Sequence, residues 1–175
     1  MNISLIVALT ADGFIGRDSS HLADWTGKAD KRLFVRLTRE AGTVVMGSRT
    51  FATINRALSG RRTIVYTTRP EQITVPGVET TSESPEALVA RLEREGATGL
   101  AIAGGTAVYT QFMQANLVDE LHITIVPVVF GTGIRLFQAE LAMRLQLIRA
   151  TPLEDGAVYL HYRAVAPAQH AENDA

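Results

Sequence analysis

The feature that most constrains this chain is an alternation between short apolar segments and longer segments with helical periodicity. The apolar segments are rich in Val, Ile, Leu and Tyr and are bounded by turn residues, which is typical of strands. Several are apolar throughout, as expected for strands that are covered on both faces. The predicted strands comprise residues 3–9, 43–46, 63–66, 100–103, 121–129, 145–148 and 158–162.

Amphipathic helices are expected between these strands. Phe34 and Leu37 recur at a spacing that lines one helix face, and Gly42 follows as a stop signal. Another segment begins Ser-Pro-Glu at Ser84, which supplies a cap and a proline in the first turn. The predicted helices comprise residues 30–41, 48–55, 84–95 and 106–115.

This order of elements predicts an α/β fold of three layers, with a mainly parallel twisted sheet and helices on both faces. The last three strands have no helix between them, so the C-terminal edge of the sheet is expected to be antiparallel. The chain has 175 residues, a length that fits one domain with a substantial core. We assign that domain to residues 1–165, and we expect residues 166–175, which are polar and rich in alanine, to form a flexible tail.

Composition excludes several classes of function. The 17 Lys and Arg residues nearly balance the 18 Asp and Glu residues, which gives no support for a nucleic-acid or anionic-membrane partner. The absence of cysteine excludes disulfide scaffolds, thiolate metal sites and cysteine nucleophiles. No apolar run approaches the roughly 18 residues of a membrane helix. The expectation is a soluble, cytoplasmic, single-domain protein.

Histidines give no metal-ligand spacing in the sequence, so no metal site is predicted. His122 and His161 fall in predicted strands and are assigned structural roles.

Asp30 is the first candidate for chemistry. Helical spacing places it on the same face as Phe34 and Leu37. A carboxylate at the rim of an apolar face is costly unless it is paired or functional. An acid also suits the first turn of a helix, where it complements the positive end of the helix dipole. Spacing alone leaves both roles open.

Glycines mark two junctions between a strand and a helix, at Gly47 and at the Gly104–Gly105 pair. Such glycines let a phosphate approach the backbone at a helix N-terminus, although a tight turn explains the pair equally well. Their spacing matches neither a dinucleotide fingerprint nor a P-loop.

Arg61 lies in a Gly-Arg-Arg sequence that is compatible with bidentate anion binding and with a solvated surface charge. Trp25 lies in a long segment between the first strand and the first helix, and long loops of this kind are commonly functional or disordered.

These features occur in a characteristic order along the chain. The order comprises Ala8, Asp12-Gly13-Phe14-Ile15-Gly16, Trp25, Asp30 with Phe34, Met46-Gly47-x-Arg49-Thr50-Phe51, Gly60-Arg61, Thr67-Thr68-Arg69, Gly104-Gly105 with Val108-Tyr109 and Phe112, and Leu121-His122-Ile123-Thr124. Together they resemble the dihydrofolate reductase family, whose superfamily also contains the pyrimidine reductase domain of riboflavin synthesis. The resemblance runs from about residue 2 to about residue 137.

The resemblance implies a sheet of about eight mostly parallel strands, NADPH as the cofactor, and hydride transfer to a pterin, converting dihydrofolate to tetrahydrofolate. Asp30 matches the acid that holds the pterin ring and promotes protonation of N5. Thr124 matches the threonine that supports this carboxylate, and Trp25 belongs to the mobile loop that closes over nicotinamide. These three residues are the implied catalytic group.

The implied substrate contacts are Ala8, Phe34, Ile54 and Arg61, of which Arg61 matches the arginine that binds the carboxylate of the folate glutamate tail. The implied cofactor contacts lie around the nicotinamide, the diphosphate and the 2′-phosphate. They are Ala8, Ile15, Gly16, Gly47, Ser48, Arg49, Thr50, Thr67, Thr68, Arg69, Ala103, Gly104, Gly105, Thr106, Ala107 and Val108.

Three departures from the family pattern bear on the substrate and the cofactor. Lys31 occupies a usually apolar position beside the substrate, and residues 126–137 look closer to the riboflavin-pathway reductases. Ser48 stands where many members carry a basic residue for the cofactor phosphates. This departure weakens the expectation of NADPH over NADH.

Two alternatives to dihydrofolate reduction follow. The first is a reductase of the same superfamily that acts on another heterocycle, such as the riboflavin-pathway ribosylamino-pyrimidine. The second is a non-catalytic nucleotide-binding protein on this fold, against which the combination of Asp30, Trp25 and Thr124 argues. The apolar residues 125–137 fit either a homodimer contact or an internal strand and its turn.

Overall fold

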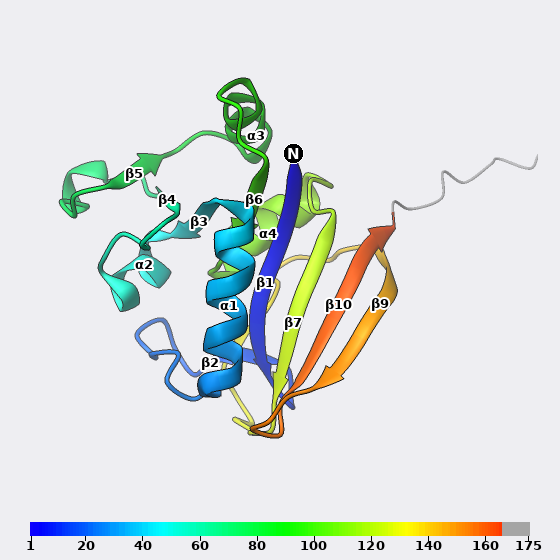
Figure 1. Cartoon of the computed structure of the whole chain (residues 1–175). Coiled ribbons are helices and arrows are strands. Elements are labelled where there is room, and N and C mark those ends of the chain that lie inside the picture. Colours follow the sequence, from blue (N-terminus) through cyan, green and yellow to red (C-terminus); the bar gives the residue numbers. More distant parts are fainter. Residues whose placement is uncertain (166–175) are drawn as a thin grey trace, which may run out of the picture.

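An eight-stranded sheet forms the centre of the computed structural model, which describes residues 1–165 (Figure 1). The strands lie in the order β5-β4-β3-β6-β1-β7-β10-β9. Their bounds are β1 Asn2–Thr10, β3 Thr43–Gly47, β4 Arg62–Tyr66, β5 Val78–Thr81, β6 Gly99–Ile102, β7 Glu120–Val126, β9 Arg144–Pro152 and β10 Val158–Val165. The strands from β5 to β7 pair in parallel, whereas β10 is antiparallel to both β7 and β9. The expected parallel sheet with an antiparallel C-terminal edge is confirmed. The expected tail lies outside the described residues.

Helices cover both faces of this sheet, as the alternation predicted (Figure 1). They are α1 Gly27–Ala41, α2 Ser48–Ile54, α3 Pro85–Arg94 and α4 Thr106–Gln114, with a short 3-10 turn at Pro70–Gln72. No helix in the described part of the chain is long and apolar enough to cross a membrane.

Adjacent residues of one strand explain why the strands are apolar throughout. On β1, Leu5 packs into a cluster with Leu92 of α3 and Phe112 of α4. Its neighbour Ile6 faces the opposite side and packs with Phe51 of α2 in a second cluster. Because successive side chains of a strand point to opposite faces, both faces must be apolar when both are covered.

Several boundaries differ from those predicted, among them those of β9, which was expected over residues 145–148 and comprises Arg144–Pro152. The strand expected over residues 121–129 ends at Val126, because Pro127 has no amide hydrogen to continue the ladder and the Val128 amide turns back to the Val126 carbonyl at 2.8 Å. The helix expected from Asp30 begins at Gly27. The segment between β4 and α3, expected to be a loop, contains the short edge strand β5.

A second, two-stranded sheet joins the segment after β1 to the segment after β7. It consists of β2 Phe14–Gly16 and β8 Ile134–Arg135. Gly133 faces Gly16 so closely that a Cβ atom at Gly133 would lie 2.5 Å from the Gly16 carbonyl oxygen. The sequence predicted neither strand, because each is too short to show a period of two.

Candidate active site

Asp30 lies in the first turn of α1, near Thr124 of β7. Burial raises the pKa of its carboxyl above the usual value, while hydrogen bonding by the Thr26 and Thr124 hydroxyls opposes that rise. Thr124 is buried and pairs directly with Ala8 of β1. The sheet register therefore brings together the acid, its supporting hydroxyl and the alanine expected beside nicotinamide.

A second carboxylate, missed from the sequence, approaches the start of α1. The Ala29 amide donates a hydrogen bond to Asp155, in the turn between β9 and β10, at 3.2 Å. Asp155 thus accepts from a helix-terminal amide, because Thr26, the N-cap residue, makes no capping hydrogen bond with its side chain. Its negative charge also contributes to raising the pKa of Asp30. No short-range pattern links these residues, which are 126 positions apart.

Trp25, assigned to a mobile loop by the resemblance, packs against Phe130 in the segment after β7. The two rings meet edge to face, with centroids 5.1 Å apart. The ring of His21 also meets Phe130, at 5.4 Å, and the Arg17 guanidinium lies 4.2 Å from the same ring. The loop between β2 and α1 is therefore anchored on one aromatic side chain.

Asp12 fixes the segment that carries Phe130. Its carboxylate accepts a hydrogen bond from the Gly131 amide at 2.6 Å and from the Phe130 amide at 3.1 Å. The Thr10 hydroxyl donates to the same carboxylate at 2.5 Å. These bonds lower the pKa of Asp12, with the Thr10 hydroxyl as the largest cause. Asp12 thus joins the segment after β1 to the segment after β7 that carries Phe130, the partner of Trp25.

The two predicted glycine junctions converge at the carboxyl ends of β3 and β6. The Gly47 amide donates to the Gly104 carbonyl at 2.8 Å. Gly104 has φ +117°, and a Cβ atom there would lie 3.3 Å from the Thr50 hydroxyl oxygen. A Cβ atom at Gly105 would lie 3.1 Å from the same oxygen. Glycine is therefore required by the close approach of this turn to α2.

The remaining expected cofactor contacts lie around this junction and on nearby strand ends. Gly105 is the N-cap of α4 and offers no side chain to the first amides of the helix. The Thr106 hydroxyl, by contrast, donates to the Arg135 carbonyl of β8. Val108 is buried below Gly47, Ala103 follows β6, and Ala107 is exposed.

The strand ends next to that junction carry polar and basic side chains. Ser48 and Arg49 begin α2, and Arg49 is exposed. Thr67 follows β4, where its hydroxyl accepts from the Arg69 amide at 3.0 Å, and Thr68 lies between the two. Gly16 ends β2, and Ile15 packs against the core on the α4 side of the sheet. The structure thus places most of the expected cofactor residues at neighbouring strand ends, where open α/β sheets bind ligands.

Arg61, the expected partner of a substrate carboxylate, is tied to α1. Its guanidinium donates to the Thr38 hydroxyl at 2.7 Å. Burial, the largest cause, and the charges of Arg39 and Arg56 lower its pKa. The substrate-wall residues Phe34 and Ile54 both pack against the cluster on this face of the sheet.

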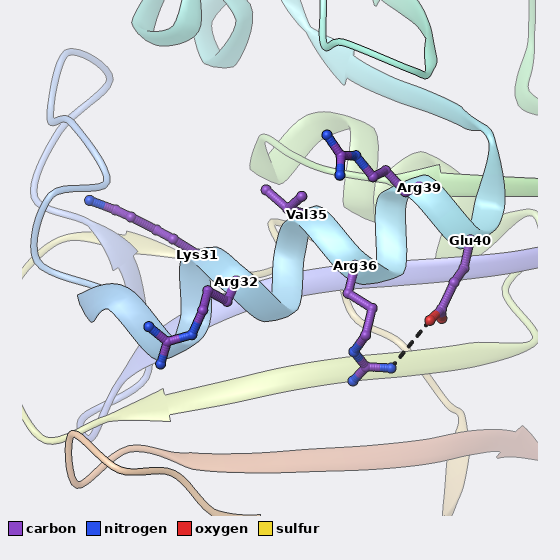
Figure 2. A pocket seen from close by; sticks show the side chains of 6 residues that line it. All are labelled: Lys31, Arg32, Val35, Arg36, Arg39 and Glu40. Carbon is purple, nitrogen blue, oxygen red and sulfur yellow. Dashed lines mark hydrogen bonds and ion pairs between the residues drawn. The ribbon is translucent and has the colours of Figure 1, made fainter.

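A hollow of about 570 Å³ does not coincide with these residues. It lies along the exposed side of α1, where Figure 2 shows Lys31, Val35 and Arg39 on one side of the helix and Arg32, Arg36 and Glu40 on the other. The strand ends are the stronger candidate for the site, because every residue that lines this open surface is exposed.

Comparison with known proteins identifies the family. Residues 2–141 match the family profile of dihydrofolate reductase. The chain belongs to the dihydrofolate reductase family. Membership makes it a reductase that takes its hydride from a nicotinamide cofactor.

Two curated relatives support this assignment. A dihydrofolate reductase type 3 of Salmonella typhimurium is 38% identical over 124 residues, which cover 71% of each chain. YwjB of Bacillus subtilis, an uncharacterised protein, is 30% identical over 168 residues, 90% of this chain and 95% of YwjB.

Solved structures from both branches of the superfamily share the fold. A putative riboflavin biosynthesis protein from Shewanella sp. PV-4 has a TM-score of 0.80 and 22% identity, covering 94% of this chain and 99% of that protein. Dihydrofolate reductase from Enterococcus faecalis, complexed with NADP(H) and RAB-propyl, has a TM-score of 0.71 and 23% identity, covering 93% of this chain and 96% of that protein. The expected resemblance and fold are confirmed, while the substrate is left between the two branches.

Proposed function

We propose that this chain reduces dihydrofolate to tetrahydrofolate with NADPH, and that Asp30 handles the proton. The observation that supports this proposal most is the position of Asp30, a partly buried acid with a raised pKa beside the buried Thr124. Reduction of the pterin requires a hydride and a proton, and the bound nicotinamide supplies the hydride. The protein therefore has to orient the ring and hold one proton.

Asp30 performs both tasks in this proposal. A carboxyl group can hydrogen-bond the amino group and ring nitrogen of a pterin, and its raised pKa makes Asp30 hold a proton more readily than an exposed aspartate does. Thr124 acts as a positioning residue, because its hydroxyl fixes the carboxyl without taking part in the transfer. Trp25, two residues before the start of α1, packs against Phe130.

The residues at the strand ends fit a dinucleotide diphosphate. Gly104 and Gly105 let the backbone approach a ligand, and the first amides of α4 donate no hydrogen bond to a cap side chain. The exposed Arg49 and Arg69 add positive charge near the same edge. We infer that these groups bind NADPH, with Thr67 and Thr68 beside its 2′-phosphate.

Arg61 supports a folate rather than a small pterin. Arg39 and Arg56 lie close enough to influence its pKa, so three cations gather where α1 meets the loop before β4. Such a cluster favours an anionic substituent, as the glutamate tail of folate provides.

A second candidate substrate is the riboflavin-pathway ribosylamino-pyrimidine. Lys31, exposed on α1 directly after Asp30, favours it, because a cation beside the ring pocket suits a ribose phosphate better than an apolar aromatic group.

Parallel assays separate these substrates. NADPH oxidation is followed by absorbance with dihydrofolate and with the pyrimidine, each at matched concentrations. Turnover of dihydrofolate, together with a thermal shift from methotrexate in the presence of NADPH, is the expected result. Turnover of the pyrimidine alone, with no methotrexate shift, contradicts the folate assignment, and NADH in place of NADPH tests the cofactor.

A further inference from the structure

Three metal-ligating side chains meet on the sheet at a distance from Asp30. Glu120 and His122 lie on one face of β7, and His161 lies directly opposite His122 on the antiparallel strand β10. Each offers one ligand atom, and these three atoms all lie within 4.8 Å of one another. Sequence spacing gave no sign of this cluster, because the third residue comes from a strand that follows much later in the chain.

The distances within the cluster suit a common metal ion. A Glu120 carboxylate oxygen lies 3.1 Å from His161 Nε2 and 3.7 Å from His122 Nε2. Ligands about 2.0–2.1 Å from a tetrahedral Zn²⁺ are separated by about 3.4 Å. Small side-chain movements would therefore suffice to bring the three atoms onto one ion.

The hydrogen bonding of the histidines points to the same arrangement. His122 Nδ1 lies 2.7 Å from the Tyr159 hydroxyl, which holds the ring from behind and leaves Nε2 facing Glu120. His161 Nε2 is buried and makes no hydrogen bond with any described residue, although the Glu120 oxygen is nearby. A buried polar atom without a hydrogen-bond partner calls for an explanation, and an ion bound between His161 and Glu120 would provide one.

The cluster opens into a hollow of about 330 Å³ between the sheet and the second half of α1. Arg36 and Glu40 contribute to its wall, and Figure 2 shows them on the same side of α1. Arg36 Nη1 lies 3.4 Å from Glu40 Oε1. Arg149 of β9 lines it too. The positive charges of Arg36 and Arg149 thus balance the negative charges of Glu40 and Glu120. An ion held by the three ligands would have a free coordination position toward the hollow.

This hollow is separate from the proposed reductase site. It contains Asn2 and Gly99, at the amino ends of β1 and β6, whereas Gly104 and Thr67 follow the carboxyl ends of β6 and β4. Asp30 lies near the beginning of α1 and Glu40 near its end.

We propose that Glu120, His122 and His161 form a binding site for a divalent transition metal of the Zn²⁺ type, with three protein ligands and one open position. Two imidazoles and one carboxylate are the donor set of many zinc sites that keep a fourth position for water or a substrate. Tyr159 is a positioning residue that orients His122 through Nδ1. The alternative is a purely structural stack, since the two histidine rings lie 4.4 Å apart at 24°.

Isothermal titration calorimetry with Zn²⁺ on the tag-free, chelator-treated full chain distinguishes a metal site from a purely structural stack of histidines. The expected result is one equivalent bound by the wild type and no saturable binding by His161→Gln or Glu120→Gln. The matched control is the double variant His21→Gln and His170→Gln, which removes the other two histidines and keeps the cluster. Unchanged binding by both cluster variants, or no binding by the wild type, overturns the proposal.

Tyr159→Phe separates a metal site from a structural stack. The variant keeps the ring in the core and removes only the hydroxyl that contacts His122. Loss of this contact should weaken Zn²⁺ binding by about 10-fold or more, as outer-shell substitutions do. Circular dichroism and thermal melting without metal verify folding for every variant. Mg²⁺, which prefers oxygen ligands, should not compete, and competition by Mg²⁺ at equal concentration contradicts the histidine ligands.

Discussion

Replacement of Asp30 by asparagine tests the proton-handling role most directly. The substitution keeps the size of the side chain and its hydrogen bond to Thr124, but removes the proton donor. Because burial raises the pKa of Asp30, the folded state binds this proton more tightly than the unfolded state does. The stability from this group is therefore fully present below its unfolded pKa and is lost as pH rises through the folded value. Asp30→Asn should consequently melt at the same temperature as the wild type, or higher, at neutral pH.

The expected effect on turnover is large. A positioned general acid contributes about 10²–10⁴-fold to a rate, which corresponds to about 2.7–5.4 kcal/mol in the activation barrier. Because burial of the Asp30 carboxyl limits the access of water, solvent is a poor substitute as a proton source. We expect the upper half of this range, a loss of about 10³-fold or more in kcat/KM for dihydrofolate.

Steady-state assays with NADPH over a range of pH provide the measurement. Wild-type activity should fall as pH rises through the raised pKa of Asp30, whereas the residual activity of the variant should lack that titration. The matched control is Asp24→Asn, an exposed acid in the preceding loop, which should leave turnover unchanged. A folded Asp30→Asn protein with near-normal kcat/KM at neutral pH would refute the assignment.

Two further substitutions probe the surroundings of the site. Asp155→Asn removes a like charge and should lower the pKa of Asp30, moving the alkaline limb of the pH–rate profile to lower pH, while Glu154→Gln beside it should leave the profile in place. An unshifted profile in Asp155→Asn contradicts that coupling. Gly104→Ala introduces a side chain at φ +117° and 3.3 Å from Thr50, so it should cost about 1–3 kcal/mol of unfolding free energy and raise the KM for NADPH. Thermal melting and cofactor titration test this, and an unchanged KM would remove Gly104 from the cofactor site.

The architecture could be predicted from the sequence because the decisive signals are local. Strands buried on both faces must be apolar at every position, and Leu5 and Ile6 show this in adjacent residues. The wrongly predicted strand end and the missed strands fall where local sequence signals are weak or contradictory. The run after Leu121 stays apolar beyond Val126, but Pro127 ends the ladder, and β2 is too short to show any periodicity.

The site was predictable only in part. The position of Asp30 alone fitted both a helix-terminal acid and a proton-handling acid. The resemblance to the dihydrofolate reductase family, through Thr124 in a distant strand, favoured the second role. Its catalytic role stays a prediction, although the structure places Thr124 beside it. Asp155 and Phe130 could not be inferred, because their contacts with the start of α1 and with Trp25 depend on how two turns fold back.

The histidine cluster shows where sequence spacing fails in principle. Glu120 and His122 are two residues apart, so any strand places them on one face, and that much was available from the sequence. His161 joins them only because β10 pairs with β7 in the register that sets His161 opposite His122. A shift of one residue would turn the His161 side chain to the other face and leave two ligands, too few for a stable zinc site. Mutation of the ligands therefore tests the register of this strand pair as well as the metal.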